Sequence, residues 1–257
     1  MLVDTFMFYN ELDVLELRLR TLEPYVDKFV IVEAEVNHVG GPKELFFEKN
    51  KERFEKWFPR IEHVIVRAGD CPTDKNPWSR EKFQRECILR GLENVCVSDD
   101  NVVMISDVDE IPDLTKIRWE HLPQAIMAVH MWMYVYNFEY VFTDEPWIGT
   151  VLTTYGLVKR HGPNYFRDRR WHFPLVHYAG WHVSSFGDGK HVENKMKTFA
   201  HALDQNDHKQ FQTEENINRW IQEGLWMDGV KKLNTRPEGA PLPPVPIEFL
   251  KKLNFIK

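Results

Sequence analysis

The segment Val102–Asp113, VVMISDVDEIPD, decides the fold class and marks the chemistry of this chain. Its first half is a short apolar run, which is typical of a strand buried on both faces. The run leads directly into Asp107, Asp109 and Glu110. In extended backbone alternate side chains point the same way, so Asp107 and Asp109 can face one site at the carboxyl end of the strand.

Three similar apolar runs precede this segment, at Leu2–Tyr9, Phe29–Val32 and His63–Val66. Leucines at helical spacing follow the first run, with Asn10 as the expected N-cap. Ser79–Leu92 is amphipathic at helical spacing and lies just before the acidic strand. Strands and helices that alternate in this way predict an α/β fold, with a Rossmann-type mixed sheet that is mainly parallel and flanked by helices.

The second half of the chain has a different pattern. Aromatic residues are dense in Ala125–Trp147 and Trp171–Trp181, which predicts mixed strands and loops. Ile217–Leu225 has helical spacing, whereas the Pro-rich segment 237–246 cannot form a regular helix. We expect one catalytic domain over residues 1–257, divided into a nucleotide-binding half (1–115), an acceptor-side half (116–235) and a Pro-rich tail (236–257).

Composition excludes several classes of protein. The net charge is -6 and the basic residues are scattered, which argues against nucleic acid as a partner. No apolar run approaches the roughly 20 residues that a membrane span needs, and no signal peptide is evident. The three cysteines, Cys71, Cys87 and Cys96, form no CxxC pair. We therefore expect a soluble, cytoplasmic protein with free thiols.

Asp107 and Asp109 predict a divalent-metal site. Open α/β sheets bind ligands at the carboxyl ends of their strands. Two carboxylates with room for further ligands suit Mg²⁺ or Mn²⁺, which share their coordination sphere with water and phosphate oxygens. The alternative is that both aspartates solvate a turn, where Asp is common.

Several stretches, taken in order, resemble glycosyltransferase family 17, the β-1,4-N-acetylglucosaminyltransferases. They are FYNELDVLELRL (Phe8–Leu19), VDKFVIVE (Val26–Glu33), GPKELFF (Gly41–Phe47), NPWSREKFQR (Asn76–Arg85), ISDVDEIP (Ile105–Pro112) and AGWHVSSF (Ala179–Phe186). The resemblance implies a GT-A-like fold, a UDP-sugar donor such as UDP-N-acetylglucosamine, a glycan acceptor and inversion at the anomeric carbon. It also implies Mn²⁺ or Mg²⁺ at Asp107 and Asp109. His182 is the third candidate ligand, and a histidine packed in an aromatic core is the alternative.

The donor is expected over the ends of the first two strands. Glu33 can accept a hydrogen bond from the base or ribose, or it is a solvated strand end. An arginine on the helix before the acidic strand can stack on uracil or pair with phosphate, or it faces solvent. An aromatic ring can cover the sugar, although large aromatics are more often core. The candidate donor-binding residues are Phe8, Asn10, Glu11, Glu33, Arg80, Arg85, Asp107 and Trp181.

An inverting transfer needs a carboxylate base for the acceptor hydroxyl. The sequence leaves four candidates, which are Glu110, Asp144, Glu145 and Asp188. Two other functions also remain open. One is a catalytically silent carbohydrate-binding protein with the same fold. The other is a nucleotidyl- or phosphotransferase, although neither GxxxxGK[ST] nor GxGxxG occurs.

Overall fold

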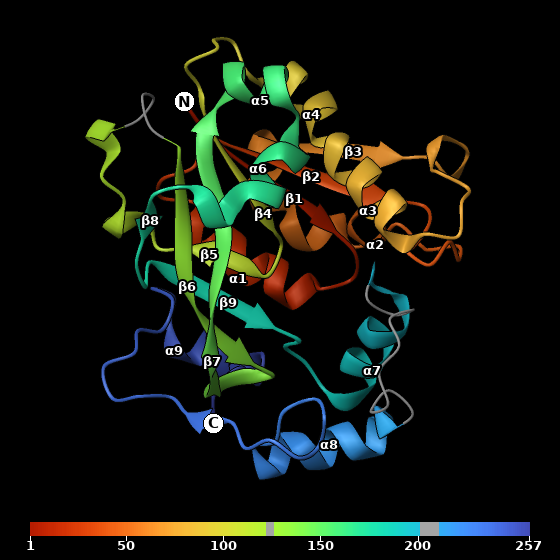
Figure 1. The fold of residues 1–257 in the computed structure, drawn as a ribbon, viewed down its shortest axis with the longest axis vertical. Coiled ribbons are helices and arrows are strands. Elements are labelled where there is room, and N and C mark those ends of the chain that lie inside the picture. Colours follow the sequence, from red (N-terminus) through yellow and green to blue (C-terminus); the bar gives the residue numbers. More distant parts are fainter. Residues whose placement is uncertain (122–125, 201–210) are drawn as a thin grey trace.

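The structure is a computed structural model that describes residues 1–121, 126–200 and 211–257. The strands are β1 (Leu2–Phe8), β2 (Lys28–Ala34), β3 (Ile61–Val66), β4 (Val102–Asp107), β5 (Glu110–Pro112), β6 (Met127–Val135), β7 (Asn137–Thr154), β8 (Leu175–Val176), β9 (Gly180–Ser184) and β10 (Asn234–Thr235). They form one sheet in the order β3-β2-β1-β4-β7-β6-β9-β5, with β8 beside β6 and β10 beside β7 (Figure 1).

The α-helices are α1 (Leu12–Leu22), α2 (Phe46–Lys49), α3 (Pro77–Glu86), α4 (Ile88–Val95), α5 (Tyr155–His161), α6 (Pro163–Arg169), α7 (Gly189–Thr198), α8 (Glu214–Glu223) and α9 (Ile247–Lys252). Tighter 3₁₀ turns occur at Lys51–Arg60, Ala68–Asp70, Leu114–Lys116, Trp119–His121 and Arg170–His172. Within the described ranges, no helix combines the length and the apolar character needed to cross a membrane.

The N-terminal part of the sheet is parallel, as the sequence predicts. β1 pairs in parallel with β2 on one side and with β4 on the other, and β3 continues from β2. Parallel strands need helical crossovers, which α1, α3 and α4 supply. β7 then pairs antiparallel to β4 and carries the sheet into the aromatic half. The predicted mixed α/β fold is confirmed and is compatible with a GT-A-like fold.

Both faces of the parallel strands are buried. Alternate side chains of β2 enter different cores, since Ile31 packs in the cluster that contains α1 and α9, whereas Val30 packs in the cluster that contains α4 and α5. Gly91 on α4 allows the closest approach of helix to sheet, because a Cβ there would lie 2.4 Å from a Val30 methyl. The apolar runs of the strands are therefore explained by burial on two sides.

Two predicted helices differ in their boundaries. The first begins at Leu12 with Glu11, not Asn10, at the N-cap position. The predicted helix at Ser79–Leu92 is two helices, α3 and α4, which meet at Cys87. α3 starts earlier than predicted, because Asn76 caps the Trp78 amide at 3.1 Å. Ala125, the first residue of the predicted aromatic stretch, lies outside the described residues.

The C-terminal tail packs on the sheet. The Pro241 carbonyl accepts hydrogen bonds from Tyr134 Oη at 3.0 Å and from Trp181 Nε1 at 2.7 Å. Phe255 is 2% exposed, and its ring lies 4.9 Å from that of Phe186. The segment 237–246 contains no helix, as expected from its prolines. The tail thus completes the core on the α1 face of the sheet.

We predict that Phe255→Ala lowers the free energy of unfolding by about 3–5 kcal/mol, because it leaves a cavity between the tail and the sheet. Urea unfolding followed by circular dichroism measures this change. Ile247→Ala on α9 is the matched control, since Ile247 is 44% exposed, and its effect should stay within about 0.5 kcal/mol. Equal effects of the two variants would contradict the packing of the tail.

Candidate active site

A buried ion pair between α1 and β1 holds the acidic turn 107–110 in place. Arg18 on α1 and Asp4 on β1 are both fully buried and lie 2.6 Å apart. The same guanidinium donates to three carbonyl oxygens of the turn, at 3.2 Å (Asp107), 3.3 Å (Val108) and 2.6 Å (Glu110). Arg18 presents its donors in a planar fork, which suits several acceptors at once. The turn is therefore held at the carboxyl end of β4.

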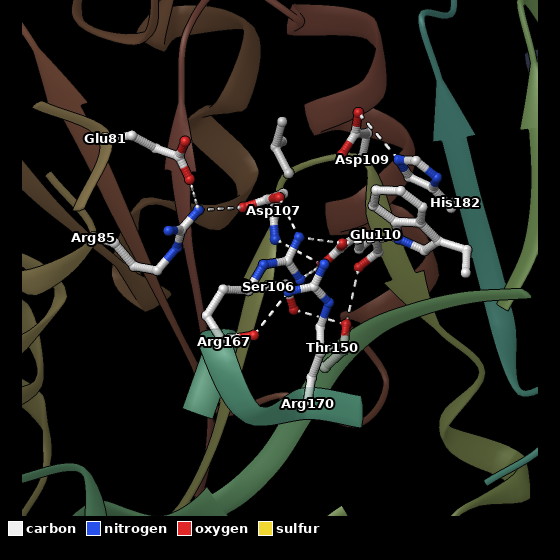
Figure 2. A network of polar contacts seen from close by, with 12 residues as sticks. Glu81, Arg85, Ser106, Asp107, Asp109, Glu110, Thr150, Arg167, Arg170 and His182 are labelled. Atoms are coloured by element: carbon white, nitrogen blue, oxygen red, sulfur yellow. Dashed lines mark hydrogen bonds and ion pairs between the residues drawn. The ribbon is translucent and has the colours of Figure 1, made fainter. Parts of the chain in front are cut away.

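Glu110 is a structural carboxylate. Its side chain is fully buried, and Arg167 donates to both of its oxygens at 2.7 and 2.6 Å. The Trp147 indole donates to the same carboxylate at 2.9 Å. The Asp107 amide donates to it at 3.0 Å (Figure 2). Charged donors on both oxygens hold a carboxylate in one orientation. Glu110 thereby ties α6 and β7 to the turn.

Asp107 lies between two arginines. Arg167 donates to one oxygen, and Arg85, which also binds Glu81 at 2.6 Å, donates to the other at 3.2 Å (Figure 2). Burial raises the pKa of Asp107, but Arg167 and Arg85 outweigh it and hold the pKa below its usual value. Asp107 therefore presents a carboxylate whose charge is already neutralised.

Asp109 faces the opposite side of the turn. β5 pairs with β9 so that Glu110 lies opposite His182, which brings His182 Nε2 to 3.7 Å from Asp109 Oδ2. Lys195 Nζ on α7 donates to the same oxygen at 2.9 Å. Burial raises the pKa of Asp109, yet Lys195 and His182 lower it well below its usual range. Trp147 stacks on His182 with 4.0 Å between ring centroids, which fixes the imidazole.

The donor set of Asp109 and His182 fits a divalent cation that shares its coordination with a ligand. A span of 3.7 Å lies within reach of one ion with metal–ligand distances of about 2.1 Å. Across the described part of the chain, no three His, Cys, Asp or Glu side chains group closely enough to form a complete metal site. Water and phosphate oxygens would have to fill the other positions, as they do in many Mg²⁺ sites.

The turn opens into a cavity of about 550 Å³. Its walls come from the ends of β1 and β2, from α3 and α6, and from α7. The residues that line it include Phe8, Tyr9, Glu11, Val36, His38, Lys43, Trp78, Glu81, Lys82, Arg85, Asp107, Asp109, Met133, Trp147, Arg167, Asp168, Arg170, His182, Ser184, Ser185, Lys195, Met196, Thr198 and Trp226. A cavity of this size is typical of a small-molecule site.

The cavity brings together part of the predicted site. Phe8, Glu11, Arg85, Asp107, Asp109 and His182 all line it. Four predicted donor-binding residues do not, and these are Asn10, Glu33, Arg80 and Trp181. The Glu33 carboxylate instead binds the Phe47 amide at 2.9 Å, and Trp181 faces the tail. Arg80 donates to the backbone carbonyls of His38 and Asn76 and thereby fixes the start of α3.

The four predicted candidates for the base lie outside the cavity lining. Glu110 is fully buried, and Arg167 binds its carboxylate. Asp144 and Glu145 are exposed on β7, and Asp144 pairs with Lys231. Asp188 caps α7 by accepting from the His191 amide at 2.8 Å. Each of these carboxylates therefore has a structural or surface position.

Among the described residues, sequence reasoning missed seven charged residues that line the cavity, which are Lys43, Glu81, Lys82, Arg167, Asp168, Arg170 and Lys195. Arg167 and Asp168 follow Pro163 in a basic segment that could have been predicted as a helix, since proline favours the first turn. No local pattern distinguishes Lys195 from the other lysines of its helix.

We predict that Arg167→Met lowers the free energy of unfolding by about 3–5 kcal/mol at pH 8, because it leaves Glu110 buried without its cation. The pKa of Asp107 is lowered in the native protein, so its contribution to stability is present above its unfolded pKa. In Arg167→Met, burial favours the protonated form of Asp107. The loss in the free energy of unfolding, relative to the native chain, should therefore be smaller at pH 5 than at pH 8. Urea unfolding at both pH values measures this.

Arg160→Met is the control for this prediction, since Arg160 is exposed on α5. It should change stability by less than about 0.5 kcal/mol at either pH. An equally large loss for Arg167→Met at pH 5 and pH 8 would contradict the assigned ion pairs.

The family model described as Glycosyltransferase family 17 matches residues 1–230. The comparison with individually curated proteins found no match. The family match spans β1 to β9 and so includes the acidic turn, His182 and Lys195. The chain belongs to glycosyltransferase family 17.

Proposed function

We propose that this glycosyltransferase moves N-acetylglucosamine from UDP-N-acetylglucosamine to a glycan hydroxyl, with Mn²⁺ or Mg²⁺ and with inversion at the anomeric carbon. One observation carries the proposal. Asp109, on the turn after β4, and His182, on β9, line the same cavity as the ends of β1 and β2. Ligands of open α/β sheets bind at this edge.

The nucleoside is assigned to the part of the cavity between the strand ends and α3. Phe8 and Tyr9 at the end of β1, His38 after β2, and Trp78 on α3 line this part. Aromatic and imidazole rings suit the flat face of a pyrimidine. Arg85 and Asp107 lie next along the cavity, where a ribose and the first phosphate would follow the base.

The charges around the turn support a divalent cation. The described residues place the carboxylates of Glu81, Asp107, Asp109 and Glu110 beside the cations of Arg85, Arg167, Arg170 and Lys195. Because four negative charges already face four positive ones, a diphosphate adds negative charge without a partner. A divalent cation on Asp109 and His182 would balance that charge and act as a Lewis acid on the leaving diphosphate.

Asp168 is the proposed base for the acceptor hydroxyl. It lines the cavity on α6, and its side chain is 47% exposed, whereas those of Asp107 and Asp109 are 32% and 11% exposed. Lys82 pairs with it at 2.9 Å in a solvent-exposed position, where such a pair is weak. Its carboxylate can therefore accept a proton from a bound hydroxyl.

We predict that calorimetric titration shows binding of UDP and UDP-N-acetylglucosamine with Mn²⁺, and that EDTA abolishes or greatly weakens this binding. UDP-glucose tests the selectivity of the site for the sugar, and GDP-mannose tests its selectivity for the nucleotide. Asp109→Asn should lower metal-dependent affinity at least about tenfold, because it removes the charged ligand of the cation. Unchanged affinity in Asp109→Asn, or no binding of any nucleotide, would contradict the proposed function.

We predict that Asp168→Asn lowers kcat for transfer by about 10²–10⁴-fold and leaves the Kd of UDP unchanged, since a base acts only in the chemical step. Single-turnover kinetics with a saturating donor measures the chemical step. Lys82→Met is the matched control, because it breaks the same ion pair but keeps the carboxylate. A loss of similar size in Lys82→Met would reassign Asp168 to a structural role.

A further inference from the structure

Lys195 binds the same Asp109 oxygen that the proposed cation would coordinate. Its ammonium lies 2.9 Å from Asp109 Oδ2, and His182 Nε2 approaches the same oxygen at 3.7 Å. An ammonium and a divalent cation repel each other strongly at such separations in a partly buried site. Binding of the cation at Asp109 and His182 therefore requires Lys195 to leave that oxygen.

The other cations around the turn have less freedom to meet a ligand. Arg167 binds both oxygens of Glu110 and one of Asp107, and it is nearly buried. Arg85 binds Glu81 and Asp107, and Arg170 donates to the carbonyls of Ile148 and Arg167. Each of these guanidiniums also holds parts of the fold together, so its displacement would disturb the turn itself.

Lys195 differs from these arginines in its contacts and its chemistry. Its Nζ donates a hydrogen bond to one oxygen of Asp109. An ammonium carries three donors on a flexible four-carbon stem, so it can turn to a new acceptor while its helix stays in place. Its side chain is 17% exposed and lines the cavity. Lys195 can therefore follow a negative charge that enters the cavity.

We propose that Lys195 exchanges partners when the donor binds: it pairs with Asp109 in the free protein and with the donor's diphosphate once a divalent cation has taken Asp109. This inference rests on the proposed function and adds a phosphate-binding residue to it. Asp109 and His182 would hold the cation, which would balance part of the diphosphate charge, and the Lys195 ammonium would pair with a phosphate oxygen. Lys195 thus both competes with the cation and stabilises the leaving group.

The exchange predicts opposite effects on two affinities. Lys195→Met should bind Mn²⁺ about tenfold more tightly than the native chain in the absence of nucleotide, because the competing charged hydrogen bond is gone. The same variant should bind UDP about tenfold more weakly at saturating Mn²⁺. The EPR signal of free Mn²⁺ measures the first affinity, and calorimetry measures the second. A purely structural lysine would weaken both.

Two further variants make the experiment specific. Lys197→Met removes a charge from the same helix, where Lys197 pairs with Glu193 and is 66% exposed, and it should change neither affinity. Lys195→Arg keeps the charge, and it should bind Mn²⁺ as weakly as the native chain and retain UDP binding. Lys195→Arg also tests the inference if Lys195→Met does not fold, because tighter Mn²⁺ binding by this charged variant would overturn it.

The outcomes separate this inference from the proposed function. If the native chain binds UDP with Mn²⁺ and Lys195→Met binds both ligands unchanged, the exchange is overturned and the proposed function stands. Mn²⁺ affinity that fails to rise in Lys195→Met overturns the exchange whether or not UDP binds. If the native chain binds no UDP with any metal, the proposed function fails, and the role of Lys195 toward diphosphate fails with it.

Discussion

The fully buried ion pair of Arg18 and Asp4 is the interaction on which the site depends. It joins α1 to β1 and directs the remaining donors of the guanidinium at the carbonyl oxygens of the turn 107–110. Three carbonyls converge on one side chain, so the path of the backbone between β4 and β5 is fixed. Loss of one partner from such a pair costs about 3–5 kcal/mol, because the other charge stays buried.

On this fixed turn, neighbouring carboxylates point in different directions and have different roles. Glu110 points into the protein and is bound by Arg167 and Trp147, while Asp107 points toward the arginines of α3 and α6. Asp109 points toward β9 and α7. Trp147 links the two sides, since it bonds Glu110 and stacks on His182. The order of the residues along the turn thus separates Glu110, which anchors the turn, from Asp107 and Asp109, which line the cavity.

The parallel half of the sheet could be predicted from sequence, because β1, β2 and β4 are short, largely apolar runs buried on both faces, and β3 is a similar run at the edge. Asp109 and His182 could be named from the resemblance, and the structure places them together. Apart from Arg85, the cations could not be named, since Lys195 lies 86 residues from Asp109 in the chain and Arg167 lies 57 from Glu110. The sheet brings such pairs together through its long-range strand order, which no local pattern encodes.

The orientation of the aromatic side chains could not be predicted from the sequence either. Trp147 and Trp181 both end stretches that are dense in aromatic residues, yet Trp181 bonds the tail and Trp147 lines the cavity. Irregular pairing between β6 and β7 changes the register three times, so the face to which a side chain points does not follow from simple alternation. The proposed base, Asp168, could not be predicted for a related reason, since the exposure of a carboxylate depends on how the surrounding elements pack.

The most direct test of the account is the position of the metal in crystals grown with Mn²⁺ and UDP. Anomalous scattering identifies Mn²⁺ without reference to activity. We expect one anomalous peak within coordination distance of Asp109 and His182, with the UDP diphosphate beside it and its uracil between the end of β1 and α3. UDP bound in the cavity with no peak at Asp109, or with the peak at a different group, would contradict it.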